Sequence, residues 1–194
     1  HKGNNHPAVI LYKDNNLIVQ EWYVNGKPFR KDNLPHIEYY NDNIIIRKEW
    51  IINKYKSICE DYDDGKLISK QTFKNGEENS VDDLPSTIYY DENEIPYKYC
   101  WQRDGKLFRE DDKPNVVICD DGKIVSKKWF NADEELHRDN DLPAIISYTD
   151  GEITFQGWYI NGISRRENDL PIKEFYDNGI VVQKEWYDRC EELP

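Results

Sequence analysis

Short apolar runs dominated by β-branched and aromatic residues recur along the chain, each starting just after a proline, as in 8–12 and 115–119. Such residues favour a pleated strand, and proline at its first position costs no interior ladder bond. A turn signal and a second run ending at tryptophan follow, as in 123–130. The clearest turn signals, which supply the positive φ of type I′ turns, are Asp64-Gly65, Asp121-Gly122, Asp150-Gly151 and Asn178-Gly179. The pattern predicts a β-hairpin that ends at Trp.

The spacing of the tryptophans shows that this hairpin is repeated. Their intervals are 28, 51, 28, 29 and 28 residues, and Thr72 fills the missing place in the long interval because 72–76 matches 22–26. The six residues are Trp22, Trp50, Trp101, Trp129, Trp158 and Trp186. A fixed period of this kind is typical of a repeat protein. It predicts seven units in a single array, approximately 7–34, 35–56, 57–84, 85–113, 114–142, 143–170 and 171–194.

Other residue types recur at fixed distances from the Trp position of each unit. A proline, or Ser57 in the third unit, precedes each Trp position by 15 or 16 residues. Five residues after this marker stands a tyrosine, replaced by Cys119 in one unit: Tyr12, Tyr40, Tyr62, Tyr90, Tyr148 and Tyr176. Two residues before the Trp position the chain carries Lys or Gln, with Tyr99 the exception. These long side chains are expected to share a face with Trp and to cover the rings.

A polar connection leads from each Trp to the next proline. It contains a second turn, as at Asn25-Gly26, and a recurring arginine: Arg30, Arg109, Arg138 and Arg166. After Trp50 the connection is shorter, which predicts a tight turn at 52–54. No segment has a 3.6-residue apolar period. The sequence therefore predicts an all-β fold with almost no helix, an elongated, twisted antiparallel sheet of about seven consecutive hairpins and about 14 strands.

The net charge of the chain excludes two classes of partner. The chain has 26 Lys and Arg against 38 Asp and Glu, a formal charge of −12. Nucleic-acid and anionic-membrane surfaces need clustered basic residues, so neither partner is expected. No run of 18 apolar residues is present, so no membrane span is predicted.

Acidic pairs in the connections, such as Asp82-Asp83 and Asp111-Asp112, resemble a calcium-binding or catalytic arrangement. An arginine lies two residues before most of them, which disfavours a cation and predicts Arg–carboxylate pairing. Asp and Asn are also turn residues, so the pairs are interpreted as turns. The four cysteines form no C-x-x-C motif. They are interpreted as free thiols, and together with the absence of a visible signal peptide they favour a cytoplasmic or virion-associated location. No metal and no cofactor is expected.

The Trp and Tyr columns have two interpretations. They form the core, because a thin sheet has little else to bury, or one column faces solvent as a platform for carbohydrate or peptide. The core is favoured.

The segment 158–162 (Trp-Tyr-Ile-Asn-Gly) and the string 138–145 resemble MORN-type hairpin repeats. They are most similar to the variant in YwqK-like bacterial proteins and in repeat proteins of giant DNA viruses. The resemblance covers essentially the whole chain and implies a hairpin-array fold. It also implies a role as scaffold, assembly module or partner-binding surface, without catalysis by the repeat.

Together these features predict a non-enzymatic repeat protein for assembly or protein binding. The alternative is a partner-binding inhibitor of antitoxin type, or an acidic module that recognises a basic partner. Segment 1–7 aligns with 137–143, inside a connection, and the chain closes on Leu193-Pro194. A longer array, or self-assembly through the terminal strand edges, is therefore expected.

Overall fold

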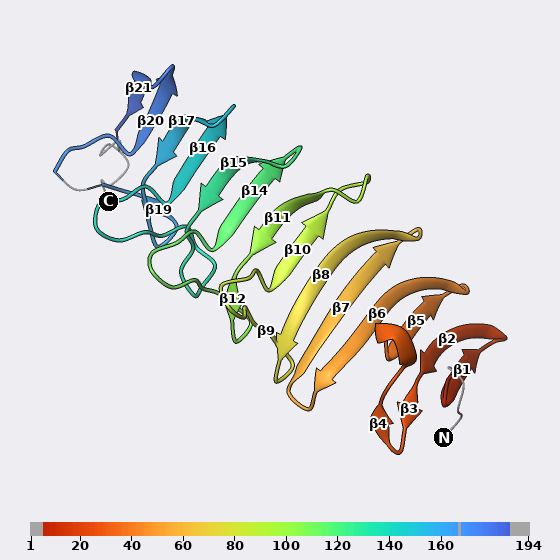
Figure 1. The fold of residues 1–194 in the computed structure, drawn as a ribbon. Coiled ribbons are helices and arrows are strands. Elements are labelled where there is room, and N and C mark those ends of the chain that lie inside the picture. Colours follow the sequence, from red (N-terminus) through yellow and green to blue (C-terminus); the bar gives the residue numbers. More distant parts are fainter. Residues whose placement is uncertain (1–5, 167, 187–194) are drawn as a thin grey trace.

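The computed structural model describes residues 6–166 and 168–186. These residues form a long antiparallel sheet that twists along its length and does not close on itself (Figure 1). They contain no α-helix and a single 3-10 turn, η1 (Lys31–Asn33). The described part of the chain accordingly holds no helix that is long and apolar enough to cross a bilayer. The prediction that the chain is a section of a longer array concerns 1–7 and 187–194, which lie almost wholly outside the described residues.

Seven hairpins follow one another along the sheet in chain order, so the predicted all-β array of consecutive hairpins is confirmed. Their strands are β1 (Val9–Lys13) with β2 (Asn16–Glu21), β5 (Ile37–Asn41) with β6 (Ile44–Asn53), β7 (Lys56–Asp63) with β8 (Lys66–Lys74), β10 (Thr87–Tyr90) with β11 (Pro96–Cys100), β14 (Val116–Asp120) with β15 (Lys123–Lys128), β16 (Ile145–Thr149) with β17 (Glu152–Gly157), and β20 (Lys173–Asp177) with β21 (Ile180–Glu185).

The hairpin turns have the backbone geometry that their residues favour. Asp64 and Gly65 have φ angles of 46° and 78°, and the flanking Asp63 and Lys66 pair across the turn. Positive φ at both central residues gives a turn whose twist matches that of the strands. All seven turns lie along one edge of the sheet (Figure 1).

Every hairpin carries a β-bulge beside its Tyr position, a feature that the sequence pattern did not reveal. In β5 the register shifts by one residue between Tyr39 and Tyr40, and the other six hairpins shift at the equivalent place. A bulge increases the local right-handed twist. Repeated once per hairpin, it explains why this long sheet coils instead of lying flat.

Successive hairpins pair through a short ladder. The second strand of one hairpin meets the first strand of the next over three residues, as in Val19↔Tyr39, Gln20↔Glu38 and Glu21↔Ile37. Strands β6 and β7 are the exception, because they pair from Arg47↔Asp61 to Asn53↔Lys56. The turn that joins them includes the predicted Asn53 and Lys54, and Asn53 Oδ1 accepts backbone hydrogen bonds from Tyr55 and Lys56 at 2.8 and 3.0 Å.

The connections form a second row of small hairpins along the opposite edge of the sheet (Figure 1). They contain β3 (Tyr23–Val24) with β4 (Lys27–Pro28), β12 (Gln102–Arg103) with β13 (Lys106–Leu107), and β18 (Tyr159–Ile160) with β19 (Ile163–Ser164), while β9 (Glu77–Glu78) extends the pairing of β8. The Trp side chains lie where the main sheet meets this row. Four of them, Trp22, Trp101, Trp129 and Trp158, are at most 8% exposed.

Candidate functional site

Five of the Trp side chains bind the connection that precedes their hairpin. Nε1 of Trp129 donates a hydrogen bond of 2.8 Å to the backbone carbonyl of Asp112, 17 residues earlier. The same bond, 2.8–3.2 Å long, joins Trp50 to Asn33, Trp101 to Asp83, Trp158 to Asp141 and Trp186 to Asp169. Because a buried indole N–H needs an acceptor, the bond fixes where the ring lies.

An arginine from the following connection covers the ring. Cζ of Arg138 lies 3.8 Å from the Trp129 centroid, and its Nη1 donates to the carbonyl of Pro143 at 3.1 Å. The equivalent pairs, 3.6–3.9 Å apart, are Arg30 with Trp22, Arg109 with Trp101 and Arg166 with Trp158. These four arginine side chains are only 13–16% exposed. Partial desolvation strengthens the attraction between a cation and an aromatic face.

A carboxylate from the preceding connection completes the arrangement. Nε and Nη2 of Arg138 bind the Asp112 carboxylate at 3.1 and 2.8 Å. We call each such set a clamp: an Asp, the Trp bonded to its carbonyl, and the Arg that stacks on that Trp. The clamps are Asp83–Trp101–Arg109, Asp112–Trp129–Arg138 and Asp141–Trp158–Arg166. Arg30 differs, because its Nη1 binds Glu38 of β5 at 2.6 Å.

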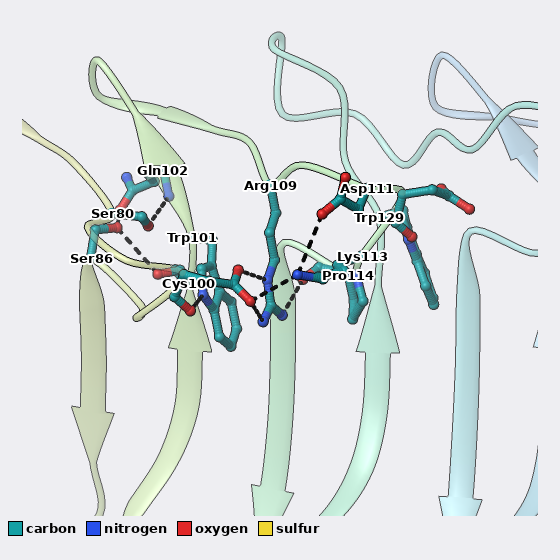
Figure 2. A network of polar contacts seen from close by, with 12 residues as sticks. Ser80, Ser86, Cys100, Trp101, Gln102, Arg109, Asp111, Lys113, Pro114 and Trp129 are labelled. Atoms are coloured by element: carbon teal, nitrogen blue, oxygen red, sulfur yellow. Dashed lines mark hydrogen bonds and ion pairs between the residues drawn. The ribbon is translucent and has the colours of Figure 1, made fainter.

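Each clamp arginine binds an aspartate of the preceding connection and not the aspartate beside it in the sequence. The sequence placed Asp111 next to Arg109, but Arg109 binds Asp83, 26 residues earlier. The physical reason is that Arg109 stacks on Trp101, and the Trp101 indole donates a hydrogen bond to the carbonyl of Asp83. This brings the Asp83 carboxylate within reach of Arg109. Figure 2 shows Arg109 between Trp101 and Pro114, with Lys113 beside it. Hydrogen bonds from Arg109 and then Lys113 hold the pKa of the Asp83 carboxyl well below its usual range.

The acidic pairs of the connections also form turns. Asp82 and Asp83 both have positive φ, at 53° and 58°, as do Asp111 and Asp112 at 59° and 50°. Asp and Asn adopt this conformation more readily than other residues with a side chain. Within 6–166 and 168–186, no group of three or more His, Cys, Asp or Glu residues is placed to hold a metal ion. Cys59, Cys100 and Cys119 are free thiols, and Cys190 lies outside the described residues.

The Tyr column meets the Lys/Gln column of the hairpin before it. Lys48 Nζ lies 4.3 Å from the Tyr62 centroid, and Tyr40 Oη lies 3.2 Å from Gln20 Oε1. Similar contacts join Lys127 to Tyr148 and Gln156 to Tyr176. The prediction that Lys and Gln cover the Trp rings is therefore corrected. The register pairs Gln20 with Glu38, which makes Tyr40 its diagonal neighbour on the same face.

Three of these tyrosines also contact a glutamate two residues earlier. The Tyr176 hydroxyl lies 2.6 Å from Glu174 Oε2, and the same contact joins Tyr40 to Glu38 and Tyr62 to Glu60. Burial and then this hydrogen bond raise the pKa of Tyr176 to about 12, and the same causes raise the pKa of Tyr40 and Tyr62. Tyr12, in the first strand, is mostly exposed, and Tyr90 is half-buried.

The third unit, where Thr72 replaces Trp and Ser80 replaces Arg, carries a polar network that the repeat pattern did not reveal. Gln102 Nε2 donates to Glu78 at 2.6 Å, and its Oε1 accepts hydrogen bonds from Ser86 at 2.8 Å and Thr87 at 3.1 Å. Ser86 and Thr87 are each 1% exposed. Figure 2 shows Gln102 next to Ser80 and Ser86. Hydrogen bonds thus substitute for a clamp at this junction.

Shallow clefts lie between successive connections. One of about 600 Å³ is bounded by Arg138, Asp141, Trp158 and Arg166, and one of about 320 Å³ by the equivalent Asp83, Trp101 and Arg109. Their clamp arginines and aspartates already bind one another. The clefts are therefore a consequence of the repeat, and their charged walls serve to join the hairpins.

Comparison with known proteins identifies no relative. No protein-family model matches this chain, and no curated protein or solved structure matches it.

Proposed function

We propose that this protein is a non-enzymatic repeat protein that acts as a structural or assembly scaffold, or as a protein-binding surface. The observation that carries the proposal is the recurrence of the clamp. The charged groups that could take part in catalysis are the Arg guanidiniums and the Asp carboxylates facing them. They are bound to each other at three successive junctions. They stabilise the array, and a repeated contact of this kind offers no single place for catalysis.

The shape of the sheet supports the same role. A single layer of strands leaves many apolar side chains in contact with solvent, among them Ile44, Ile68 and Ile124. Extended apolar surface of this kind is typical of proteins that bind other macromolecules. The resemblance to MORN-like repeats of giant DNA viruses makes a viral structural component one form of this scaffold.

A second candidate is a partner-binding inhibitor or an acidic recognition module. It is favoured by one observation, the formal charge of −12. Such a charge attracts a basic partner and accelerates its association.

Self-assembly through the edges of the sheet is a third form of the proposal. β1 and β21 each pair on one side only among the described strands. Both edge strands carry exposed apolar side chains: Ile10 and Leu11 in β1, and Ile180 and Val182 in β21. Unpaired edges with apolar side chains are ready templates for another strand.

The test is reconstitution of a defined complex. The protein is purified from its natural source together with bound proteins, and each partner is then produced separately. The complex is reconstituted from the purified components, and its molar mass is measured by analytical ultracentrifugation. A saturable complex of fixed stoichiometry supports protein binding: many copies in one particle indicate a scaffold, and a one-to-one complex indicates an inhibitor. Turnover of a small molecule by the pure protein, abolished by a single substitution, would contradict the proposal.

A further inference from the structure

The edge of the sheet that carries the seven hairpin turns differs in chemistry from the edge that carries the connections. The turn segments are 13–16, 41–44, 63–66, 91–95, 120–123, 149–152 and 177–180. We call them the tips. They contain 12 carboxylates and three lysines, so they hold −9 of the formal charge of −12. The tips follow one another along one side of the molecule (Figure 1).

The tip carboxylates are not neutralised by arginine. Lys123 with Asp150 at 3.2 Å is the sole ion pair that a tip carboxylate makes with a described residue. In the connections, by contrast, Asp83, Asp112 and Asp141 each bind an Arg. The turn itself does not need the charge, because Asn supplies positive φ as well as Asp does. Asp91 and Glu94 accept backbone hydrogen bonds, but these do not cancel their charge, so the net negative charge of the tips is available to a partner.

Exposed apolar side chains lie next to the tips. They lie at or just after the tips of four hairpins and are 39–69% exposed: Ile44, Ile46, Ile68, Ile95, Tyr97, Ile180 and Val182. Nothing in the described chain covers them. The band that combines these side chains with the tips offers both apolar area and negative charge, at four of the seven hairpins.

We infer that this band binds an extended, basic segment of a partner protein in which Lys or Arg recurs at about every third residue, with apolar residues between. This inference rests on the proposed role in protein binding and names the partner's chemistry. Charge complementarity selects a cationic segment, and the exposed isoleucines favour one with apolar side chains. Neighbouring strands lie about 4.8 Å apart, so equivalent tips are roughly 10 Å apart. A segment in the extended polyproline II conformation has three residues per turn and rises about 3.1 Å per residue, so it presents a cation to the same side about every 9 Å, close to the spacing of the tips.

The test uses a labelled synthetic peptide of about 20 residues, long enough to span most of the tips, with the repeat Lys-Ile-Ser. Two control peptides carry Lys-Ser-Ser, which keeps the charge, and Glu-Ile-Ser, which keeps the apolar residues. Fluorescence anisotropy is measured at low and at physiological salt. We expect Lys-Ile-Ser to bind most tightly and to weaken with salt. Equal affinity for Lys-Ile-Ser and Lys-Ser-Ser would overturn the apolar part of the inference, and binding of Glu-Ile-Ser would overturn the electrostatic part.

Two variants of the full chain, each with four neutralised carboxylates, locate the binding. The tip variant combines Asp42→Asn, Asp64→Asn, Asp121→Asn and Asp150→Asn. The matched control variant makes the same change in net charge at the opposite edge, with Asp32→Asn, Asp82→Asn, Asp111→Asn and Asp139→Asn, all exposed and outside the clamps. An exposed ion pair contributes little singly, so four together are expected to change the dissociation constant by about tenfold.

We expect this loss in the tip variant and less than about a third of it in the control. Equal losses, which bulk charge alone would produce, or no loss in either variant, would overturn the inference. Circular dichroism confirms that both variants fold. A natural partner whose binding the tip variant leaves unchanged would overturn this inference alone, whereas the proposed function fails only if no defined protein complex forms.

Discussion

The guanidinium of Arg138 lies flat enough over Trp129 for its Cζ to approach the ring centroid to 3.8 Å, while its Nη2 binds Asp112 at 2.8 Å. The Trp129 indole donates to the backbone of the same Asp112. Two residues of one unit, Trp129 at the end of its hairpin and Arg138 in the connection that follows, therefore bind a single residue of the preceding connection, one through its carbonyl and one through its carboxylate. This relationship recurs along the array and explains how a single-layer sheet keeps its hairpins in order.

Replacing Arg138 is expected to destabilise the protein. Arg138→Gln removes the contact with Trp129, two hydrogen bonds to Asp112 and one to Pro143, from a side chain that is only 13% exposed. We expect a loss of about 1–3 kcal/mol in the free energy of unfolding, measured by urea denaturation. The sequence alone implied a smaller effect, on the order of 0–1 kcal/mol, typical of exposed pairs. Arg103→Gln is the exposed control: Arg103 pairs with Glu110 and stacks on Phe108 at 3.9 Å but is 51% exposed, so its loss is expected to stay within that smaller range.

The indole hydrogen bond is tested without removing the ring. Trp129→Phe keeps most of the apolar surface but leaves the carbonyl of Asp112 without its donor, and should cost about 1–2 kcal/mol. Trp186→Phe is the matched control because Trp186 makes the same kind of bond, to Asp169, but is 55% exposed. Thermal melting curves that show equal losses for both substitutions would mean that burial does not determine the strength of the bond.

Stability at acid pH should depend on Asp83. Its pKa is lowered in the folded state by hydrogen bonds from Arg109 and Lys113, so its stabilising contribution is complete above the unfolded value of 3.8 and disappears as the pH falls through the lowered folded value. Asp83→Asn should therefore flatten the loss of stability below about pH 4. Asp82→Asn, at the adjacent exposed position, serves as the control in the same acid titration followed by circular dichroism.

Stability at alkaline pH should depend on the Tyr–Glu contacts. The pKa of Tyr176 is raised from 10.0 to about 12. A raised pKa means that the folded state favours the protonated phenol, so its contribution is complete below pH 10 and is lost as the pH rises toward 12. Ultraviolet absorbance should show Tyr40, Tyr62 and Tyr176 ionising above the ordinary tyrosine pKa of 10.0. Tyr176→Phe should reduce the alkaline loss, and no difference from the unmodified protein would contradict the assignment.

Much of the fold is predictable from local sequence. Asp-Gly and Asn-Gly turns, alternating strands and a Trp at a fixed interval predict hairpins, because each feature acts within a few residues. The tight link between β6 and β7 is also local, since it follows from the shortened segment between Trp50 and Ser57. The interpretation of the acidic pairs as turns depends on backbone conformations that Asp and Asn adopt without help from the rest of the chain.

Tertiary structure determines which side chains pair with each other in the clamps and in the network around Gln102. Four units offer an Arg at the same place with an Asp within the next three residues, so position in the repeat alone does not tell whether Arg109 binds Asp111 beside it or Asp83 one hairpin earlier. The choice depends on the direction in which the connection folds over Trp101 and on the distance between neighbouring hairpins. The network around Gln102 arises in the same way, because Glu78, Ser86 and Thr87 meet only when β8, β10 and the next connection lie side by side.

The sequence by itself thus determined the hairpin, its turns and its number of repeats, since short-range backbone preferences specify them. Only the tertiary structure decided the bulge at each Tyr position, the backward Arg–Asp pairing and the contact of each Lys/Gln position with the following Tyr. These depend on strand register and sheet twist, which arise when hairpins pack against one another and are not encoded at any one position.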